Sequence, residues 1–169
     1  RLSPSGWRGS QLDQPRGVRI RLAIEELGPI FVKFGQSLST RQDLLPTDIG
    51  RELTRLQDEV PPFPTEQALA EIESSFGQPA SQLFASFEHE PLAAASIAQV
   101  HGARLHSGDD VVVKILRPNV CELVRRDLEV MYALARLAER WWPESRRLRP
   151  VDIVAEYEKT ILNELDLVR

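Results

Sequence analysis

The sequence predicts an α+β fold in which helices precede and follow one small antiparallel sheet. Apolar residues recur at helical spacing before residue 84, and helical spacing returns from residue 119 toward the end of the chain. Between these regions, residues 98–105 and 111–116 have the composition of strands, and a turn of hairpin length joins them.

The composition is that of a globular protein and excludes several classes. The 169 residues suffice for one domain of ordinary size. Because 25 acidic residues outnumber 21 basic ones, a protein whose main affinity is for nucleic acid is not expected. The single cysteine, Cys121, rules out an internal disulfide framework and a multi-cysteine metal site. No apolar run approaches the roughly 18 residues that a membrane-spanning helix needs, so no transmembrane segment is expected.

Glycine and proline divide the first half of the chain into helices. Residues 1–15 contain several of these breakers and are expected to form an irregular tail. Four helical segments are then predicted, at 16–26, at 29–41, from 45–48 onward, and at 66–76. The character of the sequence changes at Phe84. We therefore expect a helical extension at 16–83 and a domain that contains the sheet at 84–169.

The predicted sheet contains a short strand at 87–90 and the pair at 98–105 and 111–116. In the last strand one face carries Val111, Val113 and Ile115, and the other carries Val112, Lys114 and Leu116. A long amphipathic helix at 119–142, a basic linker at 143–150 and a final helix from 151 are expected to follow. Because the chain begins with arginine and ends within a helical pattern, it is expected to be part of a longer protein.

Lys114 is the sharpest candidate for a binding residue, because it lies in the middle of an apolar strand. Its ammonium group needs a polar partner, since burial of an unpaired charge is costly. A phosphate group against the strand would be such a partner. Kinase-like proteins hold a nucleotide with a strand, a loop of small residues, a second strand, a turn and a third strand that carries a lysine, and this sequence has the same order. The alternative interpretation is that Lys114 extends from an edge strand to water.

The loop before residue 98 is rich in alanine. Protein kinases have glycines there, because glycine lets backbone amides close over phosphates. This sequence has Ala93, Ala94, Ala95 and Ser96 instead, and alanine methyl groups disfavour positive φ. A glycine-loop grip on phosphate is therefore not expected, and close packing is the alternative interpretation of this segment.

Two further pairs of polar residues are candidates, and a position on the protein surface is the alternative interpretation of each. Lys33 and Gln36 lie on a polar stripe of the second helix. Gly35 indicates close approach by another segment, since glycine inside a helix costs about 1 kcal/mol. Glu164 and Asp166 are about 200° apart around the last helix, so neither carboxylate can replace the other.

In this order along the chain, these motifs resemble the UbiB/ADCK family of atypical protein-kinase-like proteins, and its bacterial branch above all. The resemblance rests on Lys33-Phe34-Gly35-Gln36, Asp43-Leu44-Leu45-Pro46, the loop at 93–96, Val113-Lys114, Arg117-Pro118, and Glu164 with Asp166. It covers nearly all of the chain from about residue 16. The fold that it implies is a protein-kinase-like N-lobe preceded by a helical N-terminal extension.

The resemblance also implies roles for individual residues. Lys33 and Gln36 match the KxGQ motif, whose lysine pairs with acidic groups near the nucleotide and whose glutamine lines the same cleft. Glu164 and Asp166 match the ExD motif, which partners the KxGQ helix. Lys114 matches the strand lysine that meets the α- and β-phosphates. The expected nucleotide-binding residues are Lys114 and the segment of Leu92, Ala93, Ala94, Ala95, Ser96, Ile97, Ala98 and Gln99.

The function that the resemblance implies is that of an ATP-binding, ATPase-like or phosphotransferase protein that supports ubiquinone biosynthesis. A protein or small-molecule kinase is the alternative of the same fold. A non-catalytic scaffold that binds lipids or partner proteins is the alternative of another class. The C-lobe, with its catalytic-loop and metal-binding residues, is expected to follow residue 169, so this part alone is expected to be inactive.

The expected cofactor is ATP or ADP with Mg²⁺, and no metal ligand is expected within this chain. The expected partners are isoprenoid or quinone lipid intermediates, proteins of ubiquinone biosynthesis and a second copy in a homodimer. The resemblance places the full-length protein at the cytoplasmic face of the bacterial inner membrane.

Overall fold

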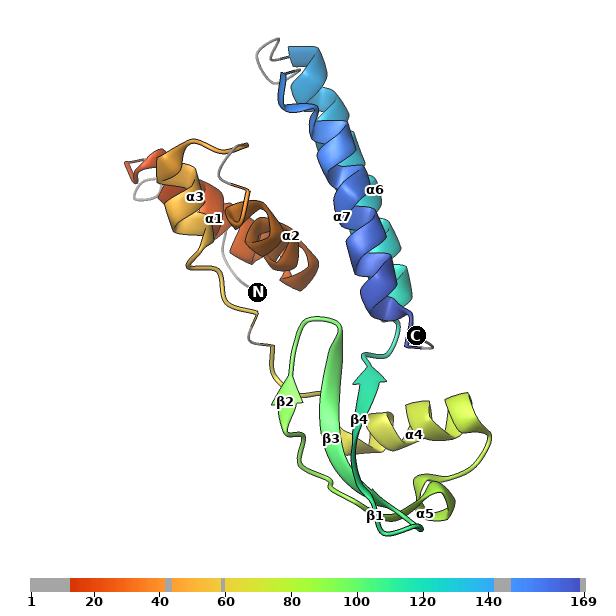
Figure 1. Ribbon diagram of the computed structural model, residues 1–169. Helices are drawn as coiled ribbons and strands as arrows, with labels where there is room; N and C mark the ends of the chain where they lie inside the picture. The colour runs from red at the N-terminus through yellow and green to blue at the C-terminus, as the bar shows by residue number, and fades with distance from the viewer. Residues whose placement is uncertain (1–12, 42–43, 59, 142–146, 168–169) are drawn as a thin grey trace, which may run out of the picture. The chain divides into compact units, whose positions relative to one another are not determined.

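A computed structural model describes residues 13–41, 44–58, 60–141 and 147–167 (Figure 1). The chain divides into two compact units. The first comprises Arg1–Asp58 and Ala138–Pro150, and the second comprises Glu59–Leu137 and Val151–Arg169. The irregular tail expected at residues 1–15 lies almost entirely outside the described residues, as does most of the predicted linker at 143–150.

The first unit contains three short helices, α1 (Arg16–Leu27), α2 (Pro29–Ser39) and α3 (Thr47–Leu53). Gly28 separates α1 from α2 with a φ of 112°, a value that favours glycine. Pro29 then begins α2, where its fixed φ is compatible with a first helical turn. The core of this unit is formed by Val32, Leu53 and Leu56 with the partly buried Ile20, Ile24, Leu38, Leu45 and Ile49. The helices predicted for this region are confirmed.

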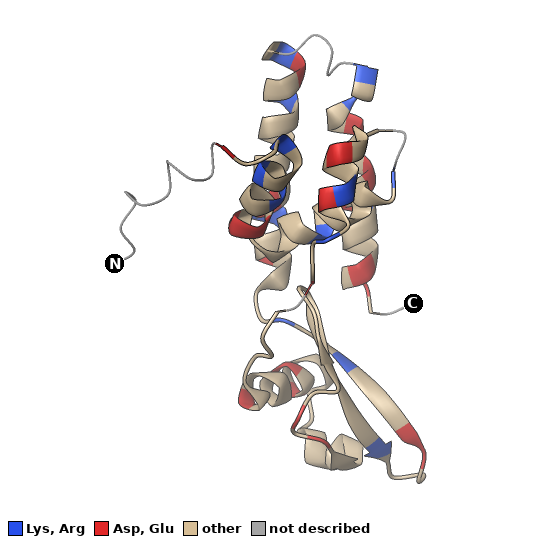
Figure 2. Cartoon of the chain, turned by 90° about the vertical axis from the view of Figure 1, so that its left-hand side faces the viewer, with Lys and Arg blue, Asp and Glu red and all other residues tan. Residues whose placement is uncertain are grey.

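The second unit is built around a four-stranded antiparallel sheet. Two helices precede the four strands along the chain. In order, these elements are α4 (Thr65–Phe76), α5 (Ala80–Leu83), β1 (Phe84–Phe87), β2 (Ala93–Ala94), β3 (Ala98–Leu105) and β4 (Asp110–Leu116). β4 pairs along one edge of β3, so β1 and β2 share the other edge. Charged side chains are concentrated on the helices, and few lie on the strands (Figure 2).

One face of this sheet is covered and the other is exposed. Ala68 and Ile72 of α4 and Ala80 of α5 pack with Ile115 of β4 in a buried cluster. Val112, on the opposite face of β4, is 69% exposed. The alternation predicted for 111–116 is confirmed. Because α4 and α5 pack on the sheet, the predicted boundary between residues 83 and 84 falls within the second unit.

The first strand differs from its predicted position at 87–90. It runs over Phe84–Phe87 instead, because both phenylalanines pack against the core cluster beneath the sheet. Glu88, His89 and Glu90 are exposed and follow the strand. The predicted turn between β3 and β4 is confirmed, and Gly108 adopts a φ of 99° within it.

Two longer helices, α6 (Val120–Trp141) and α7 (Pro150–Leu165), complete the chain. They lie side by side, and the hydroxyl of Tyr132 on α6 donates a hydrogen bond of 2.6 Å to Oε2 of Glu158 on α7 (Figure 1). This hydrogen bond and partial burial raise the pKa of Tyr132 to about 12. Among the described residues, no helix is both long and apolar enough to span a membrane.

Candidate functional site

Lys114 lies in the middle of β4, in register with the alanine-rich segment. β3 pairs Val100 with Lys114 on one side and with Ala93 of β2 on the other. Residues paired directly across antiparallel strands direct their side chains to the same face. Ala93, Val100 and Lys114 therefore form one row on the exposed face of the sheet. The backbones of its two ends are roughly 10 Å apart, the width of two strand spacings.

The alanine-rich segment is a short hairpin in this structure. Ala93 and Ala94 form β2, and the N–H of Leu92 donates to the carbonyl of Val100 at 2.8 Å. The N–H of Ala95 donates to the carbonyl of Ala98 at 2.9 Å and closes the turn that leads into β3. Three of the residues in or next to this turn, Ser96, Ile97 and Ala98, are each less than 5% exposed. Such a turn is preformed, in contrast to a mobile glycine-rich loop.

Arg117, just after β4, fixes this turn from outside. Its Nε donates a 2.8 Å hydrogen bond to the carbonyl of Ala95, and its backbone N–H donates to the carbonyl of Ile97 at 2.9 Å. Arg117 belongs to the Arg117-Pro118 motif of the family resemblance, for which no role was predicted. The contact could not be foreseen, because a backbone carbonyl acceptor leaves no mark on the sequence.

An open pocket of about 940 Å³ lies along β4 in the second unit. Lys114 lines it together with Glu71 of α4 and with Glu164 and Asp166 at the end of α7. The structure thus brings three of the predicted site residues, Lys114, Glu164 and Asp166, to one cavity. Lys114 is also exposed, because it lies on the face of β4 opposite to Ile115, which packs with α4 and α5.

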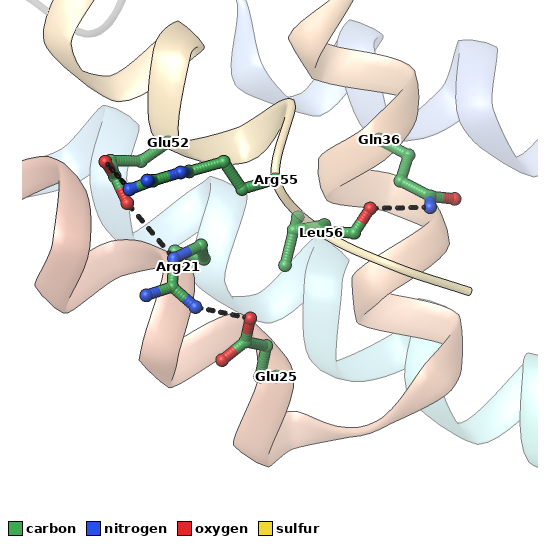
Figure 3. A network of polar contacts seen from close by, with 6 residues as sticks. All are labelled: Arg21, Glu25, Gln36, Glu52, Arg55 and Leu56. Atoms are coloured by element: carbon green, nitrogen blue, oxygen red, sulfur yellow. Dashed lines mark hydrogen bonds and ion pairs between the residues drawn. The ribbon is translucent and has the colours of Figure 1, made fainter. Parts of the chain in front are cut away.

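The other predicted site residues, Lys33 and Gln36, lie on α2 in the first unit. Nζ of Lys33 is 3.8 Å from Oδ2 of Asp58. Nε2 of Gln36 donates a 3.0 Å hydrogen bond to the carbonyl of Leu56 (Figure 3). A Cβ added to Gly35 would lie 2.4 Å from Cδ1 of Leu56. The close approach predicted at Gly35 is confirmed, and the approaching residue is Leu56. The partnership of the KxGQ helix with Glu164 and Asp166, which the resemblance implies, concerns residues of different units and stays a prediction.

A network of charged side chains supports the helices around this motif (Figure 3). Arg21 of α1 donates to Glu25 at 2.6 Å and to Glu52 of α3 at 3.1 Å, and Arg55 also pairs with Glu52 at 2.9 Å. The hydrogen bond from Arg21, aided by Arg55, lowers the pKa of the Glu52 carboxyl. These contacts join α1 to α3 and to the segment that follows α3.

The residues of the second unit fit a nucleotide phosphate better than they fit a metal ion on their own. The sequence contains three lysines against 18 arginines, and one of those lysines, Lys114, stands on the exposed face of the sheet. Lysine binds phosphate as a point charge. Among the described residues, no group of three or more His, Cys, Asp or Glu side chains is placed to hold a metal ion.

The second unit has the architecture of the N-terminal lobe of a kinase-like protein. It combines a small antiparallel sheet, a lysine in the edge strand, an alanine-rich turn and flanking helices. Residues 55–169 match the family model of the ABC1 atypical kinase-like domain, and the chain belongs to this family. The predicted family and the predicted kinase-like α+β fold are confirmed.

Curated relatives named "Probable protein kinase UbiB" are similar to nearly the whole chain. The Pseudomonas paraeruginosa protein is 59% identical over 159 residues, which are 94% of this chain and 30% of that protein. The Marinobacter nauticus protein is 58% identical over 154 residues, which are 91% of this chain and 28% of that protein. The chain therefore spans about 30% of the length of these relatives.

One similar solved structure is the complex of Rv3197 with erythromycin from Mycobacterium tuberculosis. It is 30% identical in sequence and superposes with a TM-score of 0.50. The likeness covers 81% of this chain and 37% of that one.

Proposed function

We propose that the second unit binds an adenosine nucleotide on the exposed face of its sheet, with Lys114 against the phosphates. The observation that carries the proposal is the row of Ala93, Val100 and Lys114. This row puts a cation and Ala93, at the start of the alanine-rich segment, on the same exposed surface. Val112 adds exposed apolar area next to Lys114, and apolar area with a few polar groups is typical of ligand sites.

Each part of the chain has a separate task in this site. Lys114 neutralises phosphate charge, and Arg117 holds the turn at 95–98 in the shape that faces the ligand. The bound nucleotide supplies the phosphoryl group that is released or transferred. Glu164 and Asp166 line the Lys114 pocket, where their carboxylates keep the ammonium group oriented.

The test is nucleotide affinity in the full-length protein. Lys114→Met should weaken the binding of ATP and ADP by at least about tenfold, because a charge-assisted contact contributes about 1.5–3 kcal/mol. Lys159→Met is the matched control, since Lys159 is exposed on α7 and lies outside the pocket lining. Equal affinity of the Lys114 variant and the wild type would refute the assignment.

At the level of the whole protein, the proposal is an atypical kinase-like ATPase that supports ubiquinone biosynthesis at the bacterial inner membrane. The name of the curated relatives, "Probable protein kinase", favours a protein kinase as the second candidate. Phosphate release from ATP without an acceptor, in the full-length protein, supports the ATPase. Transfer of labelled phosphate to a protein would support the kinase instead.

A scaffold without catalysis predicts a third outcome. In that case a Lys114 variant that no longer binds nucleotide should still restore ubiquinone synthesis in a cell that lacks the protein. Lipid intermediates and a second copy of the chain remain proposed partners of the full-length protein, and each can be measured by co-purification.

A further inference from the structure

The segment that joins the two units is held by side chains at several points. Residues 60–64 connect Asp58, the last described residue before the boundary, to the start of α4. The segment contains prolines at positions 61, 62 and 64, which restrict its backbone. Within the second unit, the side chains of Arg117 and Gln99 hydrogen-bond to its backbone, and Phe63 packs against the buried cluster beneath the sheet.

Arg117 reaches this connector with the same guanidinium group that holds the alanine-rich turn. Nη2 donates to the carbonyl of Pro61 at 2.8 Å and lies 3.4 Å from the carbonyl of Val60, while Nε donates to the carbonyl of Ala95. The guanidinium carbon is 5.5 Å from the centre of the Phe63 ring. Nε and Nη2 belong to one planar, rigid group. A shift of Pro61 that moves Nη2 therefore also moves Nε, which donates to the carbonyl of Ala95.

Gln99, a buried residue of β3, anchors Phe63 of the connector. Its Oε1 accepts a hydrogen bond of 3.1 Å from the N–H of Phe63, and Nε2 lies 3.4 Å from the Phe63 carbonyl. Nε2 of Gln99 also contacts Nε2 of His101 at 2.8 Å. Gln99 and His101 are both fully buried, so this anchor is rigid.

The other end of the same stretch of chain is held by α2. Lys33 pairs with Asp58, Gln36 donates to the carbonyl of Leu56, and Gly35 leaves room for the Leu56 side chain. Leu56 and Asp58 are thus held by the KxGQ motif within the first unit, and residues 60, 61 and 63 are held by Arg117 and Gln99 within the second.

We propose that Arg117 is a positioning residue that couples the alanine-rich turn to the connector at 60–63. This inference rests on the proposed nucleotide site. A nucleotide that packs against the turn favours the conformation in which Ala95 accepts from Arg117, and the same guanidinium then holds Pro61. By thermodynamic linkage, ordering of the connector raises the affinity for nucleotide by a certain factor, and bound nucleotide shifts the connector toward its ordered state by the same factor.

The first test needs no variant. Hydrogen exchange of the full-length protein should show that the amide of Phe63 exchanges more slowly when ATP or ADP is saturating. Unchanged exchange at Phe63, together with nucleotide binding, would overturn the coupling and leave the proposed function intact. Absence of nucleotide binding to the wild-type protein would overturn both.

Variants of Arg117 then isolate the coupling. Arg117→Ala should weaken nucleotide binding about tenfold and abolish the nucleotide-dependent protection at Phe63. Arg117→Lys keeps the charge but cannot donate to two carbonyls in a fixed geometry, so it should retain the fold and lose the protection. Arg104→Ala is the control, because Arg104 pairs with Asp110 on the surface of the same sheet at 2.7 Å. It should leave both measurements unchanged.

A role in folding alone would give a different pattern. Arg117→Lys would then lower the stability of the second unit while ATP still slowed exchange at Phe63, and that result would overturn the proposal.

Discussion

The substitution Gly35→Ala tests how tightly residues 56–58 pack on the KxGQ helix. A Cβ at position 35 would lie 2.4 Å from Cδ1 of Leu56, whereas carbon atoms in contact prefer about 3.5–4.0 Å. Leu56 is only 4% exposed, so its side chain must move by about 1 Å within a packed core. Such overpacking typically costs about 1–3 kcal/mol.

The same substitution also has a favourable effect, which a matched control can remove. Alanine inside a helix is more stable than glycine by about 1 kcal/mol. Gly50 lies within α3, and an added Cβ there would meet no atom within 4 Å. Gly50→Ala should therefore stabilise the unit. The two variants should differ in unfolding free energy by the overpacking cost, about 1–3 kcal/mol.

The assay is hydrogen exchange of peptides from α2 and residues 56–58 in the full-length protein. The Gly35 variant should open more readily there than the Gly50 variant, because displacement of Leu56 also disturbs its bond with Gln36. Equal opening free energies in the two variants would refute the claim that Gly35 is needed for close packing.

Two further predictions concern the buried side chain of Gln99 and the raised pKa of Tyr132. Gln99→Leu should lower the local stability around the connector by about 1–3 kcal/mol. The backbone N–H of Phe63 and the buried ring of His101 would each lose the hydrogen-bond partner that Gln99 provides. Gln67→Leu, at an exposed site on α4, should change it by less than about 0.5 kcal/mol. Because the pKa of Tyr132 is raised to about 12, its bond to Glu158 stabilises the fold fully below about pH 10 and progressively less as pH rises through 12. Denaturation curves from pH 8 to 12 should show this loss in the wild type and not in Tyr132→Phe.

The sequence predicted those parts of the fold in which periodicity decides the structure. Alternation in β4 correctly separated Ile115, which is buried, from Lys114, which is exposed. Helical spacing correctly located α6 and α7. The bounds of β1 were wrong because two phenylalanines at 84 and 87 carry the packing, and their spacing of three does not fit strict alternation.

The candidate site was predicted in part. Gly35 indicated a close approach, since glycine within a helix is costly, but no pattern in the sequence indicates that the approaching residue is Leu56. The alanine-rich segment was expected to be a loop, and pairing with β3 makes Ala93 and Ala94 a strand. The contacts of Arg117 were missed because its acceptors are backbone carbonyls, which every residue has.

The most direct test of the central claim is labelling of the full-length protein with an acyl-phosphate derivative of ATP, which acylates a lysine amine beside bound phosphates. Within these 169 residues only Lys33, Lys114 and Lys159 can react, so mass spectrometry assigns the label without ambiguity. We expect Lys114 to be acylated, excess ATP to prevent this, and Lys159 to show no ATP-sensitive labelling. A Lys114 that stays unmodified, or whose labelling ATP does not reduce, would contradict it.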